Sequence, residues 1–115
     1  MDCGIAGSAK WKGFNPKKNS LTGKTGLQGH YEKHGHEFGN INQNQYLKRA
    51  KEFATKPLTS SMQEAKVGNF VIRHDKNTGE IFVGHMSKRE IRTYYKDDGR
   101  SKTPFQDAID LAREK

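Results

Sequence analysis

The first apolar stripe along the chain predicts a helix in its N-terminal third. Leu27, Tyr31 and Phe38 lie four and seven residues apart, so they share one face of an α-helix. We expect this helix to begin between residues 21 and 27 and to run to Phe38, where Gly39 provides a stop. Its apolar face would be buried and would leave a neighbouring polar edge at a cleft or in solvent.

A second apolar stripe predicts another helix shortly afterwards. Asn42 or Asn44 is a good N-terminal cap, and the helix should end before Pro57, which disfavours helical geometry in the preceding residue. The apolar positions between them have helical spacing: Tyr46, Leu47, Ala50, Phe53 and Ala54. The polar residues 57–69 are expected to form a connection with a short helical turn at residues 62–66.

β-Branched and aromatic residues replace the helical pattern in the second half of the chain. Residues 70–74 and 80–83 flank the segment Asp75–Gly79, whose composition predicts the turn of a β-hairpin. A second turn at residues 87–88 leads to a third expected strand over residues 90–95. Together these runs predict an antiparallel meander.

Simple alternation divides the side chains of the third strand between two faces. It places Ile91, Thr93 and Tyr95 on one face and Arg92 and Tyr94 on the other. Alternation alone does not decide which face meets the helices.

The end of the chain predicts one more helix. Thr103 is a candidate N-cap, Pro104 suits the first helical position, and Gln106 completes the pattern of a capping box. The apolar stripe that follows consists of Phe105, Ala108, Ile109 and Ala112. The fold class predicted from all these elements is α+β, with N-terminal helices packed on an antiparallel β-meander and a C-terminal helix after it.

Residues 1–26 show no comparable pattern. They are rich in glycine and lysine, and such a sequence buries too little apolar surface to offset the entropy of ordering it. We therefore expect residues 1–26 to be a flexible basic arm or linker and residues 27–115 to be the folded domain. Trp11 and Phe14 are exceptions that either dock on the domain or stack on nucleic-acid bases.

Composition and charge narrow the class of protein. A chain of 115 residues with 31% hydrophobic residues suits one domain, and 21 Lys and Arg against 13 Asp and Glu give a net charge of +8. This charge favours a polyanionic partner such as RNA, DNA or an anionic membrane surface. We expect no membrane span, because no apolar run approaches the roughly 18 residues that one requires. The single cysteine, Cys3, cannot form an internal disulfide.

One polar stripe of the first helix carries candidate chemistry. His30, Lys33, His34 and Glu37 lie at positions i, i+3, i+4 and i+7, so they share one edge. Cleavage of RNA without a metal requires a base that takes the proton of the 2′-hydroxyl and an acid that protonates the leaving 5′-oxygen. Imidazoles suit both tasks because their pKa lies near 6.5, so either histidine could fill either role.

The same chemistry requires cations and hydrogen-bond donors on the scissile phosphate. Arg73 and Arg92 on the expected strands have the planar guanidinium fork that suits a phosphate, and Lys33 would add a point charge. Thr93 and Tyr95 could donate hydrogen bonds to it. The predicted catalytic set is His30, His34, Glu37, Arg73, Arg92, Thr93 and Tyr95, and the predicted substrate-binding set is Lys33, Lys88, Arg89 and Tyr94.

Metal binding is the competing interpretation of the two histidines. Tyr31 rather than Glu follows His30, so the zincin motif is not present, and Lys33 between the two imidazoles would repel a cation. We therefore expect neither a metal ion nor another cofactor.

Four segments together resemble a known family. A His-x-x-Lys-His-Gly helix and an Ile-Arg-Thr strand are similar to those of the C-terminal nuclease domain of bacterial polymorphic and contact-dependent growth inhibition toxins. These domains belong to the barnase/EndoU/colicin/RelE-like superfamily. The resemblance spans about residues 27–112 and is carried by Gly29–Gly39, Tyr46–Phe53, Thr78–Ile81 and Ile91–Tyr95.

The resemblance implies a function as well as a fold. It implies a toxin ribonuclease that cleaves RNA, often tRNA, without a metal and is neutralised by a cognate immunity protein. That protein should be acidic, because the chain is basic. Some toxins of this kind need a host factor such as elongation factor Tu. The resemblance also implies delivery as part of a larger secreted or cell-surface protein and action in the cytoplasm of a target bacterium.

Two other classes of function remain open at this point. The chain could be a basic nucleic-acid-binding domain without catalysis, in which the histidine stripe only contacts phosphates. It could also be a structural module of a phage or secretion apparatus whose charge serves assembly. Replacement of His30 and His34 should distinguish the first class from a nuclease, because only a nuclease would lose cleavage while still binding RNA.

Overall fold

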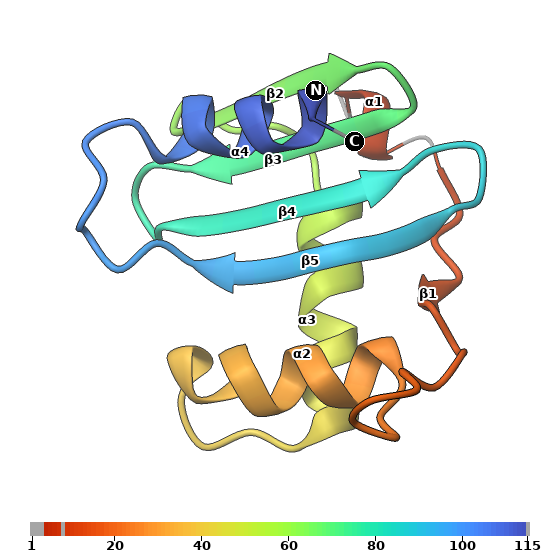
Figure 1. Cartoon of the computed structure of the whole chain (residues 1–115). Coiled ribbons are helices and arrows are strands. Elements are labelled where there is room, and N and C mark those ends of the chain that lie inside the picture. The colour runs from red at the N-terminus through yellow and green to blue at the C-terminus, as the bar shows by residue number, and fades with distance from the viewer. Residues whose placement is uncertain (1–3, 8, 115) are drawn as a thin grey trace.

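The chain folds as an α+β domain, which confirms the predicted fold class (Figure 1). The computed structural model describes residues 4–7 and 9–114. Within them the strands are β1 (Gly13–Phe14), β2 (Met62–Val67), β3 (Phe70–Asp75), β4 (Glu80–His85) and β5 (Glu90–Lys96). The helices are α1 (Gly4–Gly7), α2 (Gly26–His34), the 3-10 helix η1 (Gly35–Phe38), α3 (Gln43–Thr55) and α4 (Pro104–Arg113).

The five strands form one mixed sheet in the order β1-β5-β4-β3-β2. Strands β2 to β5 pair antiparallel, as the meander predicts, whereas β1 pairs parallel with β5 at the edge. The strand β2 corrects the expectation of a connection with a helical turn at residues 62–66. Its polar residues hide the alternation, but it pairs with β3 along its whole length, and Gly68 with φ of 59° closes the tight turn between them.

Helices cover both faces of the sheet and create two apolar cores. Helix α3 and the N-terminal segment pack on one face, around Tyr46, Phe53, Phe82 and Tyr94. Helix α4 packs on the other face, where Ile72 and Ile81 meet its buried residues. Figure 1 shows α3 behind the sheet, α4 in front of β2 and β3, and α2 beside the β5 edge.

The first predicted helix is divided at Gly35. Helix α2 ends at His34 and continues as η1, and Gly39 follows with φ of 94°. A Cβ at Gly35 would lie 2.6 Å from the Tyr31 ring, so the close packing of this ring requires glycine there. As predicted, Phe38 is buried and Tyr31 packs against the same core.

The predicted N-terminal cap is present in α3 but not in α4. Asn42 and Gln45 form a complete capping box at the start of α3, which ends before Pro57 as predicted. In α4 the predicted capping box of Thr103 and Gln106 is wrong. The Thr103 side chain makes no cap hydrogen bond to the backbone and instead donates to Asp107, 3.2 Å away.

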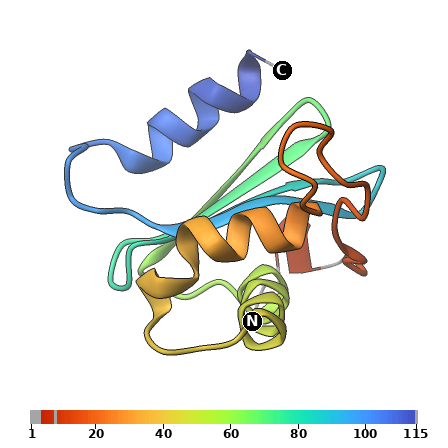
Figure 2. The ribbon, with the colours of Figure 1, turned by 60° about the horizontal axis from the view of Figure 1, so that its bottom comes forward.

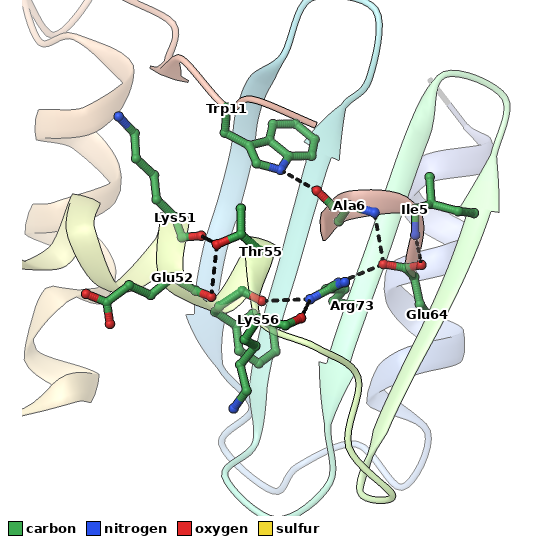
Figure 3. Close-up of polar contacts among 10 residues, drawn as sticks. Ile5, Ala6, Trp11, Lys51, Glu52, Thr55, Lys56, Glu64 and Arg73 are labelled. Carbon is green, nitrogen blue, oxygen red and sulfur yellow. Dashed lines mark hydrogen bonds and ion pairs between the residues drawn. The ribbon is translucent and has the colours of Figure 1, made fainter. Parts of the chain in front are cut away.

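Part of the N-terminal segment packs on the domain, while its residues 15–23 are exposed. Ala6, Trp11 and Phe14 are buried, so the two aromatic residues dock on the domain. The Trp11 ring lies edge-on to Phe82 with ring centroids 5.1 Å apart, and its Nε1 donates to the carbonyl of Ala6 at 3.0 Å (Figure 3). The carboxylate of Glu64 accepts hydrogen bonds from the backbone of α1. The glycine- and lysine-rich composition gave no indication that Ala6, Trp11 and Phe14 would be buried.

No helix among the described residues is both long and apolar enough to cross a bilayer.

Candidate active site

A groove of about 590 Å³ lies on the sheet face that carries α4. Helix α2 forms one wall, α4 forms the other, and β3, β4 and β5 form the floor. Figures 1 and 2 show the two helices on either side of the central strands. The lining residues are His30, Lys33, His34, Phe70, Val83, Arg92, Thr93, Tyr95, Ala108, Leu111 and Ala112. Six of these belong to the set predicted from the sequence.

A β-bulge in β5 places Arg92 in this groove. Val83 pairs with Thr93, but the next residue of β4, Gly84, pairs with Ile91, so Arg92 is an extra residue. Arg92 therefore lines the same groove as its neighbour Thr93, which corrects the expectation that alternation would place them on opposite faces. Ile91 is shifted to the buried core on the α3 face.

Glu37 fixes the orientation of the His34 ring. Its Oε2 lies 2.9 Å from Nδ1 of His34, and its Oε1 accepts a hydrogen bond of 2.8 Å from the backbone N–H of Lys96. The side chains of His34 and Glu37 are only 15% and 23% exposed. An ionised carboxylate can only accept, so Nδ1 of His34 carries a proton and Nε2 is the nitrogen left for a substrate. Glu37 itself does not line the groove and acts as a positioning residue.

His30 is partly buried and packs against aromatic rings. Its ring stacks on Phe14 with centroids 5.2 Å apart, and the His30 and His34 centroids are 6.1 Å apart. Burial, with smaller contributions from His34 and Lys33, lowers the pKa of His30 to about 4. Its buried Nδ1 has no hydrogen-bond partner within the described part of the chain. His30 is therefore neutral at pH 7 and has an unused nitrogen.

The β5 side of the groove supplies hydrogen-bond donors. Nη2 of Arg92 lies 3.4 Å from Glu90, while its buried Nε has no hydrogen-bond partner among the described residues. The Arg92 side chain is 37% exposed, so part of its guanidinium fork is available to a ligand. Burial and then the nearby carboxylates, Asp97 first, raise the pKa of Tyr95, so its hydroxyl stays protonated and can donate.

The wall opposite α2 is apolar, and the sequence reasoning missed it. It is formed by Leu111 on α4, which is 57% exposed, and it continues into the apolar floor residues Phe70 and Val83. Leu111 is an apolar residue outside the predicted apolar stripe of α4, and its position was the only sign of this wall in the sequence. Such a wall suits the flat face of a nucleobase.

Two predicted site residues lie in the opposite core instead. Arg73 is fully buried on the α3 face, where its Nε donates to Glu64 at 2.7 Å and its Nη1 donates to the carbonyls of Phe53 and Lys56 (Figure 3). The prediction that it grips a phosphate is wrong, because alternation along β3 directs it away from the groove and the ion pair with Glu64 holds it there.

Tyr94 is fully buried as well, so its predicted substrate contact is also wrong. Its hydroxyl donates to Glu80, and its carbonyl accepts a 2.5 Å hydrogen bond from Tyr46. Lys88 and Arg89 are exposed in the β4–β5 turn but do not line the groove. Arg89 holds this turn with φ of 52°, and its carbonyl accepts from the backbone N–H of Lys12.

The described residues offer no alternative centre for a metal ion. Among them, no three His, Cys, Asp or Glu side chains gather in a way that could hold one.

Comparison with known proteins leaves the toxin-nuclease resemblance a prediction. No protein-family model matches the chain, and a search of curated proteins finds no match.

Proposed function

We propose that the chain is a ribonuclease and that the groove between α2 and α4 is its active site. The observation that carries the proposal is that one groove contains two imidazoles with different environments, His30 and His34, opposite the guanidinium of Arg92. These are the groups required to cleave RNA through its own 2′-hydroxyl.

The environments of the two histidines assign their roles. His30 is neutral at pH 7, so it takes the proton of the 2′-hydroxyl. The 2′-oxygen then bonds to phosphorus, and the bond from phosphorus to the 5′-oxygen breaks. His34, whose ring Glu37 orients, donates the proton that the 5′-oxygen needs. The products are a 2′,3′-cyclic phosphate and a free 5′-hydroxyl.

The remaining groove residues act on the phosphate. Arg92 and Lys33 offset the charge that develops on the pentavalent phosphorus, and Thr93 and Tyr95 donate hydrogen bonds. Because two cationic side chains already surround this position, the proposed reaction requires no metal ion.

The biological setting is part of the same proposal. The net charge of +8 and the resemblance described above support RNA, and tRNA in particular, as the substrate class. They also support a toxin that is delivered into a target bacterium, a cognate acidic immunity protein, and elongation factor Tu as a candidate host factor.

Cleavage of total bacterial RNA in EDTA tests the function directly. We expect cleavage that persists in EDTA and leaves 2′,3′-cyclic phosphate ends. His30→Ala and His34→Ala should each reduce the rate by at least about 100-fold, because each removes one proton-transfer group. Both variants should still bind RNA nearly as well as the wild type.

Controls separate the proposed function from its alternatives. Lys66→Gln, an exposed site on β2, should leave cleavage unchanged. RNA that stays intact with purified protein and also in cell extract would contradict catalysis and favour a binding module. Cleavage that EDTA abolishes would contradict the metal-independent route.

A further inference from the structure

A second pocket, of about 700 Å³, lies on the other side of His30 from the groove. Its walls are the N-terminal part of α2 and the loop between β1 and α2, which Figure 1 shows against that end of the helix. Four lysines line it: Lys17, Lys18, Lys24 and Lys33. No carboxylate lines this pocket among the described residues, although Lys24 forms an ion pair with Glu32 outside it.

The lysines are carried by a loop with its own hydrogen bonds. The backbone N–H of Gly26 donates to the carbonyl of Asn15 at 2.9 Å, and that of Asn19 donates to the carbonyl of Lys24 at 2.8 Å. Gly23 donates to Asn19 at 2.7 Å and has φ of 71°, which allows the loop to turn back on itself. The loop therefore presents its cations in a defined place.

The pocket and the groove adjoin each other. His30 and Lys33 line both of them, so His30 lies between the groove and the loop lysines. A ligand that extends past His30 enters a region of concentrated positive charge, close to the end of α2 where the helix dipole also favours an anion.

We propose that this pocket binds the phosphate on the 5′ side of the nucleotide whose 2′-hydroxyl is attacked. The inference rests on the proposed function. His30 meets the 2′-oxygen of that nucleotide, so the side of His30 away from the scissile phosphate faces the 5′ direction of the strand. The phosphate one nucleotide upstream then meets Lys17 and Lys18.

The position of the pocket next to the groove favours an RNA strand over an acidic protein as the occupant. The charge alone would suit either partner. Only a strand that already occupies the groove, however, would place successive phosphates on both sides of His30.

Three short substrates test the proposal. They carry the dinucleotide at the cleavage site mapped in total RNA, either without a terminal phosphate, with a 5′-phosphate, or with a 3′-phosphate. We expect the 5′-phosphate to raise kcat/KM about tenfold, as one charge-assisted contact would, and the 3′-phosphate to have little effect. The double variant Lys17→Gln/Lys18→Gln should lose this gain while it cleaves the unphosphorylated dinucleotide like the wild type.

A charge-matched control tests whether the effect is local. Lys66→Gln/Lys76→Gln removes the same charge from exposed positions that line neither the pocket nor the groove, and it should keep the full gain. Thermal melting should confirm that both double variants are folded. With a longer single strand, Lys17→Gln/Lys18→Gln should also reduce the slope of log affinity against log salt by about 0.7, the value for one phosphate contact.

The failure of this inference can be told from the failure of the proposed function. If the wild type cleaves RNA but the 5′-phosphate gives no gain, or the 3′-phosphate gives it instead, the assignment of the pocket is overturned and the nuclease stands. If the wild type cleaves nothing, the nuclease fails. The pocket is then tested by binding: equal affinity of the wild type and Lys17→Gln/Lys18→Gln for a 5′-phosphorylated oligonucleotide would overturn it too.

Discussion

At the residue scale, two adjacent tyrosines of β5 have opposite surroundings. The Tyr94 hydroxyl is buried and donates to Glu80 on the α3 face, whereas Tyr95 lines the groove next to His34, with ring centroids 5.4 Å apart. The loss of one hydroxyl should therefore affect stability at the first position and catalysis at the second.

Tyr94→Phe and Tyr95→Phe form a matched pair that tests this division. Tyr94→Phe should lower the free energy of unfolding by about 1–3 kcal/mol, because it leaves the buried Glu80 without its donor, and should change kcat little. Tyr95→Phe should lower kcat about tenfold or more with little loss of stability, because a donor to the phosphate is lost. Urea unfolding and single-turnover cleavage measure the two effects, and the reverse pattern would contradict the proposed site.

His30 should also make stability depend on pH. Its folded pKa of about 4 lies below the ordinary value of 6.5, so between these values the unfolded chain binds more protons than the folded one. The contribution of neutral His30 to the free energy of unfolding is thus fully present above pH 6.5, and it is lost as the pH falls from 6.5 to 4.

Urea unfolding of the wild type and of His30→Gln at several pH values between 4 and 7.5 checks this expectation. The difference between the two proteins isolates His30 from His74, whose pKa is also lowered by burial, and from the carboxylates. We expect the wild type to lose more stability than the variant on acidification. Parallel curves would mean that His30 is not held in a dry environment.

At the scale of elements, the β4–β5 pair depends on close packing next to the bulge. A Cβ at Gly84 would lie 2.4 Å from Cη2 of Trp11, so Trp11 occupies the space that a side chain would need. The missing side chain at Gly84 thus lets Trp11 of the N-terminal segment pack against the centre of the sheet. It also lies beside the β5 bulge, which places Arg92 in the groove.

Gly84→Ala should lower the free energy of unfolding by about 1–3 kcal/mol through overpacking. In a Trp11→Ala background the same change should cost much less, because the clashing ring is gone. Gly29→Ala is the control: no atom lies within 4 Å of the added Cβ, so this helical position should gain about 0.5–1 kcal/mol. Equal costs of Gly84→Ala in both backgrounds would exclude Trp11 as the cause. Thermal or urea unfolding measures all of these variants.

At the scale of the whole molecule, the sequence predicted where the helices and strands lie better than it predicted which face of the sheet each side chain occupies. Helical and hairpin patterns located α2, α3, α4 and the meander, because local spacing and turn residues determine them. The bulge at Arg92 and the burial of Arg73 depend on pairing between strands, which alternation within one strand cannot reveal. Six of the predicted site residues line the groove, whereas Arg73 and Tyr94 are buried in the opposite core and Glu37, Lys88 and Arg89 do not line it.

The parallel pairing of β1 with β5 also constrains when the domain can form. Gly13 pairs with Glu90, His30 rests on Phe14, and the groove closes against Leu111 near the C-terminal end. Contacts between such distant parts of a chain form late in folding, because the chain must first lose the entropy of closing a long loop before these contacts stabilise the fold. A chain that is still emerging from a ribosome therefore has its histidines but not the groove around them, and any activity of the groove begins only when α4 has been made.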